Sequence, residues 1–379
     1  MMKGNIYMEK RKGKIGINTA FIMFLIIVFS PSARIFGTYT ALKADQAGWL
    51  SPIVAFLVMA YLVIELNNLF VKFPSLSLME IYEKVTGKIL AKVIALVYLI
   101  WIIILTGLNL KSYTMRLSTA VYPNIQENIF LIITLVIIGG LIVKAGFVVA
   151  SRMFKIFFWI TALGFFVLCG VLFPNISINK LTPISYLDII PIFEGSIAII
   201  AIWSYITLLF IMSENIIGMK YFKKRGLQIV GYLYLAVTLL LVCLIGNSGS
   251  YVLSRSTFPY LLTVEQMILL ETITGLEAIL VVLWILSDFA LVTVLILTSL
   301  KLVKYIFNLE DTTMFTNLVT IIAFYTTNLI ANNYYTMRDF SYNYVYMINI
   351  IIFIIIPVLM SWFNKLRTKA QKALAKNSN

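Results

Sequence analysis

INTAFIMFLIIVFSPSARIF, residues Ile17 to Phe36, holds a single ionisable side chain in twenty residues. A helix of about 20 mostly apolar residues crosses the roughly 30 Å hydrocarbon core of a bilayer. Four basic residues lie between Lys10 and Lys14 just before this stretch, and no small-residue cleavage site closes it. We therefore interpret it as a first transmembrane helix and not as a signal peptide.

The rest of the chain repeats this apolar pattern. Hydrophobic residues make up 61% of the 379 residues and charged residues 12%, and the mean hydropathy is +0.96. A soluble domain keeps roughly 25% charged residues. The sequence therefore predicts an all-α integral membrane protein, one transmembrane domain over residues 1–379 with about ten helices. The ten expected spans, of which the fourth and ninth are short, are Ile17–Phe36, Gly48–Phe70, Ile89–Leu110, Ile129–Val143, Phe154–Phe173, Pro191–Met212, Leu227–Gly246, Gly275–Leu300, Phe315–Ile330 and Val345–Phe363.

The distribution of Lys and Arg predicts the orientation. With ten spans and the N-terminus inside, most of the 30 basic residues fall in cytoplasmic segments, as the positive-inside rule requires. Both termini are then cytoplasmic, and residues 364–379 form a basic cytoplasmic tail. The net charge of +14 thus reflects topology and contact with anionic lipids, not nucleic-acid binding. The outer segments hold Lys43, Lys111, Arg116, Lys180, Arg255 and Arg338.

Three connections are more than turns. Asn247 to Thr274 is expected to be a long outer segment, in which an amphipathic stretch follows Phe258 and Pro259. Residues 72–88 are expected to carry a short cytoplasmic helix near Met79 to Val85. Residues 332–346 hold five tyrosines, and we interpret them as an outer loop at the membrane interface.

Ionisable groups inside a bilayer are costly, so each is a candidate functional residue. Arg34 follows Ser30, Pro31 and Ser32, and a proline removes one helical hydrogen bond. A helix broken at Ser30 and Pro31 would present free backbone groups and a guanidinium to the bundle interior, where Arg34 suits a carboxylate. The alternative is that Arg34 lies near the outer end of the helix and reaches water.

Asp288 is the deepest carboxylate in the sequence, near the middle of the eighth span. It could bind a ligand amine, carry a proton, pair with Arg34, or only lock helices together. Glu277, eleven residues earlier on the same face, is a second coupling candidate or a solvated carboxylate. In the sixth span Tyr205 and Thr207 could line a pocket or fill the core, and Tyr98 in the third span is a weaker candidate.

Several classes of function have no support in the sequence. The chain has no histidine, and its two cysteines lie in apolar runs, where buried free thiols are expected. No nucleophile–base pair, metal-ligand spacing or nucleotide motif is present. We therefore expect no enzyme activity, no metal and no cofactor.

Short motifs along nearly the whole chain resemble those of one family, the B subunits of spore germinant receptors, a branch of the amino acid–polyamine–organocation transporter superfamily. They are Ala47-Gly48-Trp49-Leu50, Phe73-Pro74-Ser75-Leu76, Thr86-Gly87-Lys88, Ser151-Arg152, Asn179-Lys180-Leu181-Thr182-Pro183-Ile184, Ser213-Glu214-Asn215, and Phe258-Pro259 followed by Glu277 and Val281-Val282-Leu283-Trp284-Ile285.

This resemblance implies a LeuT-like fold of two inverted five-helix repeats, here residues 15–173 and 191–363. A ligand would bind at mid-membrane between broken helices 1 and 6, with helices 3 and 8 closing the site. Carried over to this chain, the lining is Ser30, Pro31, Ser32, Arg34, Tyr98, Tyr205, Thr207 and Asp288.

The chain departs from the family where a ligand would bind. The glycines expected in helix 1 are replaced by Phe29-Ser30-Pro31, and Tyr205 and Thr207 stand at the usual Gly and Glu of helix 6. Arg34 could therefore replace backbone amides in holding an anion.

The main hypothesis is a nutrient-sensing subunit in the spore inner membrane or the cell membrane. It would bind an amino acid and work with a membrane A subunit and a lipoprotein C subunit. The alternatives are a proton- or sodium-coupled amino acid permease, with Glu277 or Asp288 carrying the proton, and a scaffold subunit that binds no ligand.

Overall fold

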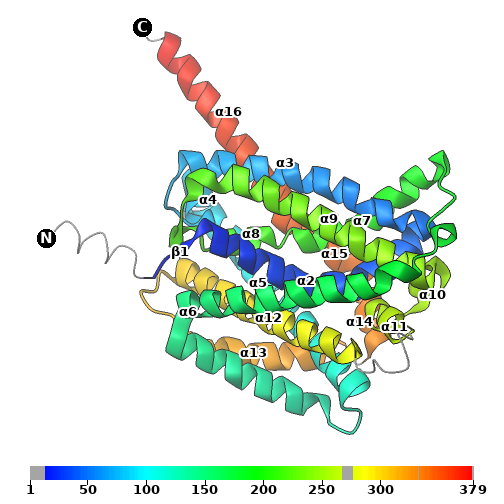
Figure 1. Ribbon diagram of the computed structural model, residues 1–379. Helices are drawn as coiled ribbons and strands as arrows, with labels where there is room; N and C mark the ends of the chain where they lie inside the picture. The colour runs from blue at the N-terminus through cyan, green and yellow to red at the C-terminus, as the bar shows by residue number, and fades with distance from the viewer. Residues whose placement is uncertain (1–12, 267–275, 332, 378–379) are drawn as a thin grey trace, which may run out of the picture.

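The structure is a computed structural model that describes residues 13–266, 276–331 and 333–377 as a bundle of long apolar helices (Figure 1). The first half contains β1 (Ile15–Gly16), α2 (Ile17–Ala44), a 3-10 turn η1 (Asp45–Leu50), α3 (Ser51–Lys72), α4 (Leu78–Thr86), α5 (Lys88–Arg116), a π turn η2 (Leu117–Val121) and α6 (Glu127–Leu172). Gly146 has a φ of 63° and folds α6 back on itself, so α6 consists of two spans.

The second half begins with three 3-10 turns, η3 (Phe173–Asn175), η4 (Ile178–Lys180) and η5 (Tyr186–Asp188). After them come α7 (Ile189–Trp203), α8 (Ile206–Phe210), η6 (Ser213–Asn215), β2 (Ile216–Ile217), η7 (Met219–Tyr221), α9 (Phe222–Ser248), α10 (Ser250–Arg255) and α11 (Pro259–Glu265). The last elements are α12 (Leu276–Phe307), α13 (Phe315–Ile330), α14 (Tyr334–Phe340), η8 (Ser341–Val345), α15 (Tyr346–Ile350), η9 (Ile351–Ile355) and α16 (Ile356–Asn377).

The described residues contain seven helical runs that are long and apolar enough to cross a membrane, and α13 is a shorter apolar helix. The run 17–72 contains both α2 and α3, and the run 127–175 contains the fold at Gly146. Counting each of these two runs as a pair of spans gives nine spans in the described residues. With α13 as the tenth, the number is the one that the sequence predicts. The start of α2 and the end of α16 lie at the same end of the bundle (Figure 1), as an even number of spans requires. We call this the basic end.

Two connections can now be compared with expectation. The short helix predicted near Met79 to Val85 is present as α4, which begins with a capping box formed by Ser77 and Glu80. The outer loop predicted over 332–346 is wrong, because α14 and η8 continue into α15 and form the first turns of the tenth span.

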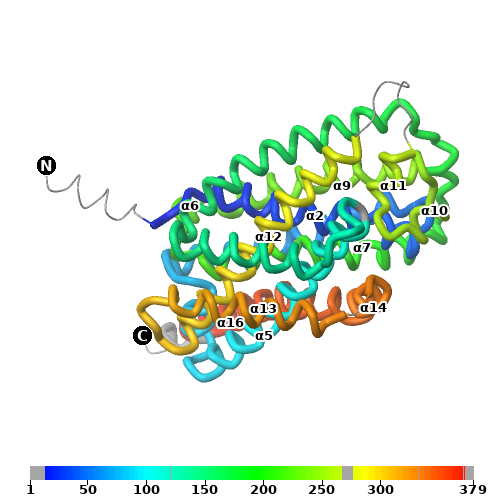
Figure 2. The backbone as a smooth tube through the Cα atoms, turned by 90° about the horizontal axis from the view of Figure 1, so that it is seen from below, coloured from blue at the N-terminus to red at the C-terminus, as the bar shows by residue number. Residues whose placement is uncertain are grey.

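Lipid-facing positions explain the composition. Val136 is 68% exposed and Leu163 is 69% exposed, as are many other large apolar side chains on the outside of the bundle. In water such a surface would drive aggregation, whereas in a bilayer it contacts hydrocarbon. The inner helices behave differently: α2 packs against α7 and α12, and α12 packs against α5 and α6 (Figure 2).

Small residues allow close helix contacts. A Cβ atom on Gly107 of α5 would lie 2.8 Å from the Thr326 methyl of α13, so the two backbones approach closely at that point. Figure 2 shows α13 and α14 beside α5, and this packing brings α14 toward the polar face of α5.

At the basic end, the segments before α2 and after α8 are joined. Strands β1 and β2 pair in parallel, with Ile15 opposite Ile216 and Gly16 opposite Ile217. Nearby, the Ser213 hydroxyl donates to the Leu76 carbonyl at 2.7 Å, and Lys301 forms an ion pair with Glu214. These contacts close the basic end of the bundle below the first and sixth spans.

Candidate functional site

The first span stays helical, but one of its backbone hydrogen bonds is replaced by bonds to a side chain of another helix. Pro31 cannot donate a hydrogen bond, and the hydroxyl of Ser287 on α12 enters the helix one residue earlier. It accepts from the Ser30 amide at 2.8 Å and donates to the Ile26 carbonyl at 2.6 Å. The expected break at Ser30 and Pro31 is therefore wrong: α2 runs continuously from Ile17 to Ala44, and a side chain of α12 replaces one turn of its hydrogen bonding.

The sixth span is interrupted between two helical segments. Helix α7 ends at Trp203 and α8 begins at Ile206, with 3-10 bonds from the Tyr205 amide to the Ile202 carbonyl at 3.1 Å and from the Thr207 amide to the Ser204 carbonyl at 3.0 Å. This tightening turns the Tyr205 side chain toward α5 and the tenth span. The resemblance implies a broken helix 6, and the structure has at this point a 3-10 turn in which Ser204 and Tyr205 keep helical backbone angles.

The tenth span contains two π segments, η8 and η9, of a kind often found at functional sites. The Tyr98 hydroxyl donates to the carbonyl of Ile352, and Thr207 Oγ1 donates to the carbonyl of Phe353 at 2.7 Å. Both acceptors lie in η9. Tyr98 and Thr207 thus fasten α5 and α8 to this irregular segment.

Buried charges meet between the first, third and eighth spans. Arg116, the last residue of α5, forms an ion pair with Asp288 of α12, and both side chains are at most 4% exposed. The Arg116 guanidinium also donates to Ser30 Oγ at 3.2 Å and lies 5.0 Å from the Trp284 ring centroid. The expected place of Arg116 in an outer segment is therefore wrong, and Asp288 pairs with Arg116, not with Arg34.

Arg34 contacts Ser112 of α5, a serine that Arg116 also contacts. Its guanidinium donates to Ser112 Oγ and to Asn109 Oδ1, the latter at 3.4 Å, while the Ser112 carbonyl accepts from Arg116 Nε at 3.3 Å. Arg34 is 8% exposed, so it is largely covered by protein and does not extend freely from the outer end of the helix, as the alternative interpretation supposed. Within the described residues, Arg34 forms no ion pair.

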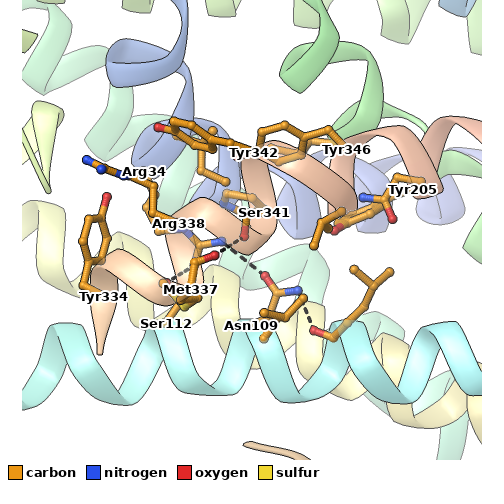
Figure 3. Close-up of a pocket in the computed structure, with 17 residues that line it drawn as sticks. Arg34, Asn109, Ser112, Tyr205, Tyr334, Met337, Arg338, Ser341, Tyr342 and Tyr346 are labelled. Carbon is orange, nitrogen blue, oxygen red and sulfur yellow. Dashed lines mark hydrogen bonds between the residues drawn. The ribbon is translucent and has the colours of Figure 1, made fainter. Parts of the chain in front are cut away.

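A cavity of about 50 Å³ opens beside Arg34 (Figure 3). It lies between α2, α5, the interruption of the sixth span and the start of the tenth, so the tenth span takes the place that was expected for the eighth. Its lining is Pro31, Arg34, Ile35, Leu105, Leu108, Asn109, Ser112, Ile202, Tyr205, Tyr334, Met337, Arg338, Ser341, Tyr342, Val345, Tyr346 and Asn349. We call it the Arg34 pocket.

The charged groups that line the Arg34 pocket are both guanidinium groups, which only donate. Arg338 is a second guanidinium in the lining, and its ion-pair partner Asp339 is 63% exposed and lies outside the pocket. The Tyr346 hydroxyl and Asn349 Nδ2 have no hydrogen-bond partner among the described residues. No Asp or Glu lines the pocket. The pocket is therefore suited to an anion.

The candidate residues from the sequence divide into two groups. Pro31, Arg34 and Tyr205 line the Arg34 pocket. The other candidates lie outside its lining and remain predictions as ligand or coupling residues. Ser30 and Asp288 contact Arg116, and Ser32 is bonded to the Val28 carbonyl. Tyr98 and Thr207 are bonded to η9, and Glu277 is exposed in the first turn of α12.

Sequence reasoning missed Asn109, Ser112, Arg338 and Asn349. Asn109 and Ser112 lie three residues apart, so they share one helical face of α5 on either side of the predicted end of that span at Leu110. That polar face was a usable signal. Asn349, a polar residue inside the predicted tenth span, was a second usable signal, whereas Arg338 could be placed only once that span was known to begin at α14.

The bundle and its interrupted sixth span define a multi-pass membrane protein with a LeuT-like transporter fold. A solved structure described as MhsT in complex with L-phenylalanine aligns with a TM-score of 0.60 over 92% of this chain and 88% of that chain, at 9% identity. At this identity the likeness shows the fold alone. The family model described as spore germination protein matches residues 16–335, and the chain belongs to that family. A comparison with curated proteins gave no match.

Proposed function

We propose that this protein is the germinant-sensing subunit of a spore germination receptor and that it binds a small nutrient, such as an amino acid, in the Arg34 pocket. The observation that carries the proposal is Arg34 itself. A buried guanidinium without a carboxylate is costly inside a membrane protein. Here Arg34 faces a cavity and meets only neutral partners in the described part of the chain. A ligand carboxylate would supply the missing charge.

Binding would act by shifting the balance between two arrangements of the bundle. A ligand can do this only if it binds them unequally. The pocket joins the interrupted sixth span to the first turns of the tenth, so a ligand that contacts both would favour one relative position of the two. We propose that this shift passes to a membrane A subunit and a lipoprotein C subunit, without enzyme chemistry in this chain.

The orientation forms part of the proposal. By the positive-inside rule the basic end is cytoplasmic, which places both termini in the cytoplasm and α14 at the outer face. The basic tail in α16 would contact anionic lipids of the spore inner membrane or the cell membrane. A nutrient would then enter the Arg34 pocket from outside, past Tyr334 and Arg338.

The test is the nutrient response of spores that carry Arg34→Ala. We expect loss of the response with normal amounts of protein in the membrane. Arg152→Ala is the matched control, because Arg152 is exposed beside the fold at Gly146, away from the pocket, and its loss should leave the response unchanged. An undiminished response in Arg34→Ala spores would refute the assignment of the pocket.

A coupled amino acid permease is the second candidate, and the transporter fold favours it. Asp288 or Glu277 would then carry the proton. Uptake of labelled amino acid into proteoliposomes, driven by an imposed proton or sodium gradient, separates the two functions. If neither uptake nor binding to a nutrient panel is found, the scaffold hypothesis is the one that remains.

A further inference from the structure

We propose that the Arg34 pocket recognises the carboxylate of its ligand and does not require an amine. The ligand class is then the small monocarboxylates: 2-hydroxy acids and simple carboxylic acids as well as amino acids. This inference rests on the proposed function, since it names the chemistry of the ligand that the pocket senses.

The first argument is the balance of charge. Arg34, Arg116 and Asp288 are buried around Ser112 and Ser30, and Asp288 is already bound to Arg116. The cluster therefore carries one surplus positive charge, on the residue that faces the cavity. Arg338 in the lining is a second, partly exposed guanidinium, and its ion-pair partner Asp339 lies outside the pocket. An anion is attracted by both guanidinium groups, whereas a ligand without a carboxylate leaves the surplus uncompensated.

The second argument is the absence of a site for a cation. No carboxylate lines the pocket. The side-chain oxygens of its two asparagines are already used, since Asn109 Oδ1 accepts from Arg34 and Asn349 Oδ1 accepts from Trp101 Nε1 at 2.8 Å. The acceptors that remain in the lining are the neutral hydroxyls of its tyrosines and serines, which offer an ammonium group no opposite charge.

The third argument is size. A single water needs roughly 10–15 Å³ of such space, so a cavity of about 50 Å³ holds a few water molecules or a ligand of comparable volume. Acids of three carbons match this space, and larger ones require the lining to move. The ring faces of Tyr334, Tyr342 and Tyr346 leave room for a short apolar substituent.

The experiment is isothermal titration of the full chain in detergent with four compounds of similar size. L-alanine has both groups, L-lactate and propionate keep the carboxylate without the amine, and L-alaninamide keeps the amine without the carboxylate. We expect lactate and propionate to bind within about tenfold of alanine. Alaninamide should bind about 10- to 100-fold more weakly, because it loses charge-assisted hydrogen bonds to a guanidinium.

Two results on the unmodified protein would overturn the inference alone. One is alaninamide binding as tightly as alanine, and the other is lactate and propionate both binding more than tenfold more weakly than alanine. If none of the four binds, the sensing function of this pocket fails together with the inference, so the two failures are distinguishable.

A variant pair then assigns the recognition to a residue. In Arg34→Gln, alanine and alaninamide should bind within about threefold of each other. Arg338→Gln, which alters the partly exposed guanidinium, should weaken the three acids alike and keep most of the discrimination. Unchanged discrimination in a folded Arg34→Gln protein would contradict the role of Arg34.

Discussion

The surplus positive charge at the centre of the bundle makes an unusual prediction: the two members of one ion pair should not be equally important. In Asp288→Asn, Arg34 and Arg116 are left with no buried carboxylate, and removing one partner of a buried pair costs about 3–5 kcal/mol. In Arg116→Met, a second buried guanidinium, that of Arg34, remains in the cluster, since Arg34 contacts the same Ser112 as Arg116. We expect this second loss to be smaller, about 1–3 kcal/mol.

The assay is thermal unfolding of purified protein in one detergent, followed by intrinsic fluorescence. Unfolding entropy of about 2 cal/mol/K per residue, scaled to 379 residues, converts 1 kcal/mol into a Tm shift on the order of 1 °C. Asp288→Asn should therefore lower Tm by about 3–5 °C and Arg116→Met by about half as much. Glu194→Gln serves as the control, since its pair with Lys43 is largely exposed and worth at most about 1 kcal/mol.

The order of the two variants decides the matter. If Arg116→Met lowers Tm as much as Asp288→Asn or more, then Arg34 does not compensate Asp288, and the argument from surplus charge is wrong. Adding Asp288→Leu to Arg116→Met should cost less than Asp288→Asn alone, because no unpaired carboxylate remains.

Three further variants test the packing around the site by the same Tm measurement. Ser287→Ala leaves the Ser30 amide and the Ile26 carbonyl without this partner and should lower stability by about 1–3 kcal/mol. Its control Ser299→Ala loses only a bond within its own helix and should cost under about 1 kcal/mol, so equal effects would contradict the bridge from Ser287 into the first span. Tyr98→Phe removes the donor to a π-segment carbonyl and should cost about 1–3 kcal/mol, so an unchanged Tm would mean that this carbonyl finds another donor. Gly107→Ala should lower stability by about 1–3 kcal/mol, because the added methyl group overpacks the contact between α5 and α13. Its control Gly231→Ala, where nothing lies within 4 Å, should be neutral or slightly stabilising, and a neutral Gly107→Ala would refute the close approach of α5 and α13.

The spans could be predicted from sequence because lipid imposes the same requirement on each. A helix that faces hydrocarbon needs about 20 apolar residues, and that run is visible without knowledge of its neighbours. The same rule explains the error at the tenth span. Its first turns line a polar pocket, so Tyr334, Arg338 and Ser341 belong to a helix while their composition is typical of an interface loop.

The site was less predictable because it depends on pairings between distant residues. Arg116 and Asp288 are 172 positions apart, and a hydropathy profile ends the third span before Arg116. Arg34 had two interpretations from sequence alone, and only its contacts with Asn109 and Ser112 decide between them. Ser287 gave no signal at all, since a serine in a transmembrane helix commonly bonds to its own backbone.

The short parallel ladder between β1 and β2 has a mechanical consequence. It joins the entrance of the first span to the exit of the sixth, at Ile15 with Ile216 and Gly16 with Ile217. The first and sixth spans are therefore coupled at the basic end of the bundle: they move there together, or the two strands separate first. A rearrangement that moves these spans apart would begin with that separation, and a cross-link between the two strands would block it.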